Sequence, residues 1–161
     1  MDLSLTEDQD MLKKVAADFV KAEVPAHQMT QWYKNKQTFQ PQLVKKAAEL
    51  GWLGMMLPEQ FGGSELGATD CAVVFEELGH GPVPGPLFTS GIFAAQMILE
   101  GATEEQKKSL LPQLCKGESI IVPAVTDKAA YWGPEGVEAR LAKTPGGYLM
   151  TGAKRFVFDA Q

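Results

Sequence analysis

Residues 101–126 read GATEEQKKSLLPQLCKGESIIVPAVT, and the pattern of apolar residues changes within this stretch. Its first half places a hydroxyl at Thr103 and an amide at Gln106, the spacing of a capping box, which predicts that a helix begins there. Its second half contains Ile120-Ile121-Val122, a β-branched run typical of a strand. The chain is therefore expected to change from helical to β structure near residue 118.

The residues before this point predict several helices separated by proline and glycine. Thr6 and Gln9 form another capping box, followed by apolar residues at three- and four-residue steps, and Pro25 is expected to end that helix. Further helices are expected from Pro41 to Leu50, from an N-cap at Thr69 or Asp70 to Gly79, from about Phe88 to Glu100, and from Thr103 to about Cys115.

The residues after this point predict short strands. Val137, Ala139 and Leu141 alternate with polar residues, and the runs 148–150 and 155–158 are rich in β-forming residues. Three or four strands leave unpaired edges and one uncovered face. The expected fold class is therefore mainly α: a helical N-terminal domain followed by the opening strands of an incomplete β-barrel domain.

Composition excludes several classes of protein. The 161 residues carry a formal net charge of −5, with 45% hydrophobic and 22% charged residues, as in a globular protein. An acidic chain argues against nucleic-acid binding. No apolar run approaches the roughly 20 residues of a membrane span. Cys71 and Cys115 are too few and too scattered for a disulfide framework, so a reducing, cytoplasmic location is expected.

Individual residues give only weak signals of chemistry. His27 and His80 lack partners at metal-ligand spacing. Gly62-Gly63 is not followed by the Lys and Ser/Thr of a phosphate-binding loop. Cys71 lies near a helix start, where the dipole could lower its thiol pKa, although packing against a neighbouring helix is the commoner role. The adjacent Glu76 and Glu77 are expected to face different directions and form no paired-carboxylate site.

Short motifs nevertheless occur in a fixed order along the chain. They are Thr6-Glu7-Asp8-Gln9, Leu50-Gly51-Trp52-Leu53-Gly54 leading into Pro58-Glu59-Gln60-Phe61-Gly62-Gly63, Glu76-Glu77-Leu78-Gly79, Gly101-Ala102-Thr103-Glu104-Glu105-Gln106, Gly117-Glu118 before Ala124-Val125-Thr126, and Gly152-Ala153-Lys154-Arg155-Phe156-Val157. Each motif is weak alone. The ordered set spans nearly the whole chain and resembles the N-terminal part of an acyl-CoA dehydrogenase.

This resemblance implies a flavoenzyme with a helical N-terminal domain, a middle β-barrel and a C-terminal helical bundle. Residues 1–118 would form the first domain and residues 119–161 part of the second. The implied cofactor is FAD and the implied substrate an acyl-CoA thioester. A glutamate of the C-terminal domain, outside this chain, would abstract the α-proton while the β-hydride passes to the flavin. The substrate carbonyl, hydrogen-bonded to flavin and backbone, would stabilise the developing enolate.

The resemblance also implies which residues contact the ligands. The strand beside the flavin matches residues 123–126, where a backbone amide and a threonine hydroxyl would reach the pyrimidine edge. The positions that pack on the isoalloxazine ring and bond its N5 match Phe156 and Phe158, and the helix at the far end of the acyl pocket matches the stretch with Phe88 and Ile92. The implied contacts are Pro123, Val125, Thr126, Phe156 and Phe158 for FAD, and Phe88 and Ile92 for the substrate, with no catalytic residue in this chain.

Two departures from the family pattern support other hypotheses. Residues 127–133 keep an acid at Asp127 but lack the family's Gly-Ser-Asp turn, and Phe158 has no hydrogen-bond donor for N5. The chain could instead belong to a flavin-less, non-catalytic subunit of a hetero-oligomer, or it could be a helical interaction module without enzymatic role. The expected partners are acyl-CoA, the missing middle and C-terminal domains or a related subunit, and further copies in a homo- or hetero-oligomer.

Overall fold

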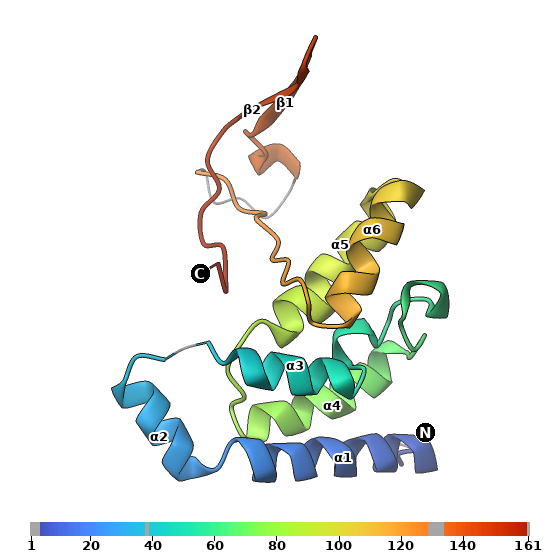
Figure 1. Ribbon diagram of the computed structural model, residues 1–161, viewed down its shortest axis with the longest axis vertical. Helices are drawn as coiled ribbons and strands as arrows, with labels where there is room; N and C mark the ends of the chain where they lie inside the picture. The colour runs from blue at the N-terminus through green and yellow to red at the C-terminus, as the bar shows by residue number, and fades with distance from the viewer. Residues whose placement is uncertain (1–3, 38, 129–133, 161) are drawn as a thin grey trace.

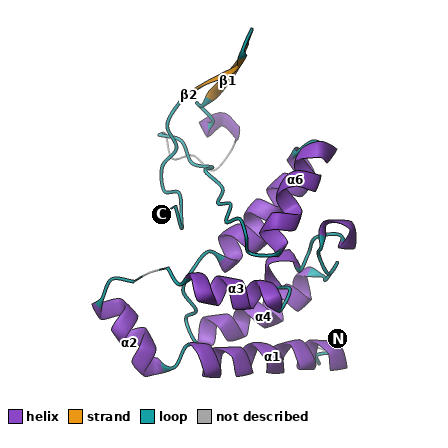
Figure 2. Ribbon diagram, in the orientation of Figure 1, coloured by secondary structure: helices purple, strands orange, loops and turns teal. Residues whose placement is uncertain are grey.

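The computed structural model describes residues 4–37, 39–128 and 134–160 (Figure 1). Helices make up most of the described chain, and strands occur only at its C-terminal side (Figure 2). The α-helices are α1 (Glu7–Glu23), α2 (Ala26–Lys34), α3 (Pro41–Glu49), α4 (Ala68–His80), α5 (Ala95–Gly101) and α6 (Glu104–Cys115). The shorter turns are η1 (Trp52–Gly54), η2 (Glu59–Phe61), the π-helical η3 (Thr89–Ala94) and η4 (Pro134–Gly136).

Both predicted capping boxes are confirmed. The Thr6 hydroxyl accepts a hydrogen bond from the Gln9 N–H at 3.2 Å, and the Gln9 side chain accepts from the Thr6 N–H at 3.1 Å. Thr103 and Gln106 make the same reciprocal pair at 3.3 and 2.9 Å. These bonds satisfy amides that have no partner within the helix, and so they fix where α1 and α6 begin.

Two details of the predicted helices are wrong. Pro25 ends α1, but it also precedes an unforeseen helix, α2, because a proline at a helix start loses no intrahelical hydrogen bond. Helix α4 begins at Ala68, with Gly67 as its N-cap, rather than after Thr69 or Asp70. The Asp70 carboxylate instead reaches back to accept a hydrogen bond from the Gly67 N–H at 2.8 Å.

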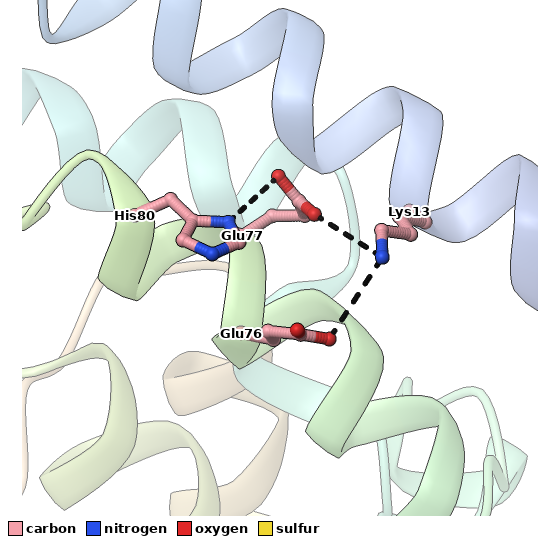
Figure 3. A network of polar contacts seen from close by, with 4 residues as sticks. All are labelled: Lys13, Glu76, Glu77 and His80. Atoms are coloured by element: carbon pink, nitrogen blue, oxygen red, sulfur yellow. Dashed lines mark hydrogen bonds and ion pairs between the residues drawn. The ribbon is translucent and has the colours of Figure 1, made fainter.

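Helices α1 and α4 lie side by side and share a charged network (Figures 1 and 3). Lys13 Nζ lies 3.9 Å from a Glu76 oxygen and 3.6 Å from a Glu77 oxygen. The other Glu77 oxygen lies 3.3 Å from Nδ1 of His80. The two glutamates therefore converge on one lysine instead of serving separate faces, and their role is to join two helices.

The apolar core lies where α1, α3, α4 and α6 meet around η1. Trp52 of η1 is buried and packs edge-on against Phe19 of α1, with ring centroids 4.9 Å apart. The other large side chains with almost no exposed surface are Leu53, Met55, Leu57, Val74, Leu111 and Leu114. They come from segments far apart in the sequence, so the helical part has a core of its own.

The glycine-rich loop after η2 folds back onto the core. The N–H groups of Ser64, Glu65 and Leu66 donate hydrogen bonds to the carbonyls of Gly54, Leu57 and Met55 at 3.1, 3.0 and 2.7 Å. Gly63 lies so close to Leu57 that a Cβ at this position would fall 2.0 Å from the Leu57 carbonyl oxygen. Only glycine allows this approach.

The β part is a single hairpin that projects away from the helices (Figure 1). Strands β1 (Arg140–Thr144) and β2 (Gly147–Thr151) pair antiparallel, with Arg140 opposite Thr151 and Thr144 opposite Gly147. All ten residues of the two strands are exposed. The fold class is thus confirmed as mainly α with the start of a β domain.

Two of the predicted strands are wrong. Residues 120–122 and 155–158 do not form strands in the structure. A β-branched run becomes a strand only where a neighbouring strand accepts and donates its backbone hydrogen bonds. Among the described residues, the segments before and after the hairpin share one backbone hydrogen bond, from the Arg155 N–H to the Thr126 carbonyl at 2.7 Å.

Candidate functional site

The π-helical turn η3 brings the helical part against the chain that leads to the hairpin. Ser90, at the inner face of the turn, is buried, and its hydroxyl accepts a hydrogen bond from the Ile121 N–H at 3.2 Å. A Cβ at Gly91 would meet the Leu53 Cα at 3.0 Å, so glycine lets the turn lie directly on η1. π-helical turns often occur at functional sites.

A small cavity of about 50 Å³ lies between this turn and the C-terminal segments. Its lining comes from three places in the chain, which are the η3 turn, the segment after α6 and the segment after β2. The residues that line it are Thr89, Phe93, Pro123, Val125, Thr126, Phe156 and Phe158. The structure therefore brings together all five residues that the resemblance assigns to the flavin.

The segment after β2 is held in an unusual backbone conformation. Phe156 and Asp159 have φ angles of 51° and 58°, the left-handed region that residues other than glycine rarely adopt. The Thr89 hydroxyl donates a hydrogen bond to the Asp159 carboxylate at 2.6 Å, which ties this turn to η3. Phe156 and Phe158 remain 72% and 70% exposed, so each offers an aromatic face that the protein does not cover.

Phe88 and Ile92, the predicted substrate contacts, do not line this cavity. Phe88 packs edge-on against Phe75 of α4, with ring centroids 5.7 Å apart, beside a separate groove of about 320 Å³. Ile92 is half-buried and packs against the core. Their neighbours Thr89 and Phe93 face the cavity instead. The resemblance names Phe88 and Ile92 as substrate contacts, which stays a prediction, and it did not identify Thr89 and Phe93.

A buried carboxylate lies next to the cavity, on Asp127. One of its oxygens accepts hydrogen bonds from the Glu138 and Ala139 N–H groups at 2.6 and 3.2 Å, and it lies 3.0 Å from Lys154 Nζ. The hydrogen bond from Lys154 is the main reason that the pKa of Asp127 is lowered, and the two backbone N–H groups add to this against the opposing effect of burial. Asp127 is therefore held as a carboxylate. Residues 129–133, where the family's Gly-Ser-Asp turn is missing, lie outside the described residues.

Other candidate groups do not gather into a reactive site. Burial, aided by the nearby charge of Asp70, raises the pKa of the Cys71 thiol to about 11, and Cys71 packs in the core, the role that the sequence favoured over a thiol activated by a helix dipole. Burial also raises the pKa of Cys115. Among the described residues, no three His, Cys, Asp or Glu side chains lie close enough together to hold a metal ion. None of the helices within residues 4–37, 39–128 and 134–160 combines the length and apolar character needed to cross a membrane.

The fold and the cavity define a helical N-terminal domain joined to the start of a β domain. Residues 6–118 match the family model described as "Acyl-CoA dehydrogenase, N-terminal domain". The chain belongs to the acyl-CoA dehydrogenase family, as its ordered motifs predicted.

Individual relatives extend this match to nearly the whole chain. The chain is 32% identical to an acryloyl-CoA reductase (NADH) of Anaerotignum propionicum, over 98% of this chain and 40% of the relative. It is 30% identical to the mitochondrial isobutyryl-CoA dehydrogenase of Dictyostelium discoideum, over 96% of this chain and 37% of the relative. The solved structure "PigA with FAD and proline" superimposes with a TM-score of 0.84 at 29% identity, over 98% of this chain and 42% of that one. The chain spans at most 40% of the length of these two curated relatives.

Proposed function

We propose that this chain is the N-terminal portion of an FAD-dependent acyl-CoA dehydrogenase that oxidises an acyl-CoA thioester at its α,β bond. One observation carries the proposal: Pro123, Val125, Thr126, Phe156 and Phe158 come from two distant segments and line one cavity. Membership of the family and a relative solved with FAD support it.

The residues at the cavity fit a flavin in chemical type. Thr126 offers a backbone N–H and a hydroxyl, both suited to the oxygen and nitrogen atoms of a pyrimidine edge. Phe156 offers an exposed aromatic face for stacking on a planar ring. When bound, FAD would supply the acceptor for the hydride that leaves the β-carbon. The residues of this chain would bind and orient the ring system and exclude water from it, and the base would come from the C-terminal domain.

We assign residues 1–118 to the helical domain and residues 119–161 to part of the middle β domain. The exposed strands of the hairpin support this division, because a two-stranded sheet with both faces open is stable only against further structure. We also propose a cytoplasmic location and a place in fatty acid metabolism as part of a homo- or hetero-oligomer. The free cysteines Cys71 and Cys115 suit a reducing compartment.

The test is a flavin measurement on the complete protein that contains this chain. Purified with added FAD, it should be yellow, and an acyl-CoA thioester should bleach the flavin absorption. A protein that binds no FAD in titration would contradict the proposal.

A second candidate function is a non-catalytic subunit without flavin. Phe158 favours it, because a phenyl ring cannot donate the hydrogen bond expected at this position. In that case the protein alone should be colourless and should co-purify with a related, flavin-containing subunit. A purely structural interaction module would differ from both, since no acyl-CoA would raise the melting temperature of the complete protein.

A further inference from the structure

Asp127 and Lys154 join three segments beside the cavity. In the part of the chain that the structure describes, Asp127 and Ser90 are the buried polar or charged residues. The Asp127 carboxylate side chain is 1% exposed, and the Lys154 side chain is 25% exposed. Through the Glu138 and Ala139 N–H groups and the Lys154 ammonium, this carboxylate links the approach to β1 with the segment after β2.

Lys154 makes a further contact that reaches the cavity lining itself. Its ammonium donates a hydrogen bond to the Val125 carbonyl at 3.0 Å, while it also lies 3.0 Å from the Asp127 carboxylate. The next residue, Arg155, donates its N–H to the Thr126 carbonyl. The Val125–Thr126 stretch is thus held from the side of residues 154–155 by two independent hydrogen bonds.

Holding the Val125 carbonyl fixes the direction of the Thr126 amide. The peptide bond is planar and trans, so the C=O of Val125 and the N–H of Thr126 point in opposite directions. With the carbonyl turned toward Lys154, the Thr126 N–H is turned away from it. Among the residues that the structure describes, this N–H has no hydrogen-bond partner. A donor held in a fixed direction beside a cavity is available to a ligand.

We propose that Lys154 and Asp127 are positioning residues that aim the Thr126 N–H at the pyrimidine edge of a bound flavin. This inference rests on the proposed function. Lys154 acts through the Val125 carbonyl, and Asp127 acts by holding the Lys154 ammonium in place. Neither side chain lines the cavity, so their effect on a ligand is transmitted by the peptide plane. The lowered pKa of Asp127 agrees with a lasting charge on this carboxylate.

The test measures how the complete protein binds FAD and two analogues, 2-thio-FAD and 4-thio-FAD. Each analogue replaces one pyrimidine-edge oxygen by sulfur, a weaker acceptor. In the parent protein, the analogue whose sulfur meets the Thr126 N–H should bind more weakly than FAD. Lys154→Met removes the donor at similar side-chain length, and we expect it to raise the FAD Kd about tenfold or more. Lys154→Met should also abolish the difference in Kd between FAD and that analogue, because the substitution and the sulfur replacement affect the same hydrogen bond.

Three further variants separate positioning from folding. Lys154→Arg keeps a cation that can donate, so it should retain the preference for FAD over the analogue. Asp127→Asn removes the charge that holds Lys154 and should reduce that preference. If Lys154→Met does not fold, Lys154→Arg and Asp127→Asn still test the proposal. Lys13→Met is the matched control, because it removes a lysine from a carboxylate network in the helical domain and should leave all three Kd values unchanged.

The outcomes distinguish the inference from the function on which it rests. If the parent protein binds no FAD, the proposed function fails and the inference fails with it. If the parent binds FAD but Lys154→Met leaves all three Kd values unchanged, or raises them by one common factor, only the inference is overturned. A common factor would mean that Lys154 stabilises the fold without directing the amide.

Discussion

Replacing Gly63 with alanine is expected to destabilise the helical domain by about 3–4 kcal/mol. The added Cβ would fall 2.0 Å from the Leu57 carbonyl oxygen and 2.4 Å from its carbonyl carbon. Contacts this short do not occur between folded backbone atoms, and neither partner is a flexible side-chain end that could move aside. The loop that follows η2 must therefore move away from Leu57.

The cost can be worked from the hydrogen bonds that this movement breaks. The Leu57 carbonyl that the methyl group would strike also accepts the bond from the Glu65 N–H at 3.0 Å. The bonds donated by Gly63, Ser64 and Leu66 lie on the same turn of the loop. These are four bonds, and each contributes about 1 kcal/mol. Losing most of them gives the expected magnitude, which corresponds to a fall in Tm of about 10 °C for a chain of this size.

The measurement is urea and thermal unfolding, monitored by circular dichroism. Two other glycines of the helical part provide matched controls. Gly62 has a φ of 88°, but a Cβ there would make only an ordinary contact of 3.7 Å with Cys115. Gly62→Ala should therefore cost only the left-handed conformation, about 1 kcal/mol. A Cβ at Gly79 in α4 would meet nothing within 4 Å, so Gly79→Ala should stabilise the chain by about 0.5 kcal/mol.

The order of the three variants tests the reasoning. Gly63→Ala must unfold at the lowest urea concentration, Gly62→Ala at an intermediate one, and Gly79→Ala at or above the parent value. A Gly63→Ala midpoint equal to that of Gly62→Ala would refute the idea that close backbone approach, rather than conformation, requires glycine at residue 63.

Three smaller perturbations test other parts of the fold. Leu111 is completely buried, so Leu111→Ala should cost about 3 kcal/mol in urea unfolding. Thr103→Ala removes the α6 cap and should cost about 1 kcal/mol, whereas Thr103→Ser should retain most of it. Burial raises the pKa of Cys71 from 9.0 to about 11, so the unfolded chain loses this proton at lower pH than the folded chain. Stability should then be full below pH 9 and fall between about pH 9 and pH 11, and Cys71→Ala should flatten this slope in urea titrations at several pH values.

The helical part was largely predictable because its signals are local. A capping box specifies a helix start by contacts three residues apart, and the boxes at Thr6 and Thr103 are present as predicted. Helix α2 was missed because it buries no residue completely and because Pro25 was interpreted only as the end of α1. The start of α4 was misplaced because Asp70 caps from inside the helix, which resembles an N-cap in sequence.

The β part and the site depend on contacts between distant residues. The runs at 120–122 and 155–158 have strand-forming side chains, but the sequence does not say whether a neighbouring strand is present to pair with them. The motif match identified the residues from Pro123 to Phe158 that line the cavity. It missed Thr89 and Phe93, because a π-helical turn changes which residues of a helix share a face. It also missed the link from Lys154 to Asp127, which spans 27 positions and leaves no periodic signal.

The size of the cavity bears on the choice between an FAD-dependent dehydrogenase and a flavin-less subunit. Sites for cofactors and ligands measure about 300–1,000 Å³, far more than the 50 Å³ between η3 and the C-terminal segments. The Pro123–Thr126 side is tied to the Lys154 and Asp127 link. The η3 side rests on the core through Gly91, and Ser90 binds the Ile121 N–H. The turn after β2 is the side held least firmly, because its bond to Thr89 is exposed and two of its residues have unfavourable φ angles. A flavin that entered this cavity would therefore have to displace Phe158 with this turn, whereas a flavin-less subunit would keep Phe158 where it is.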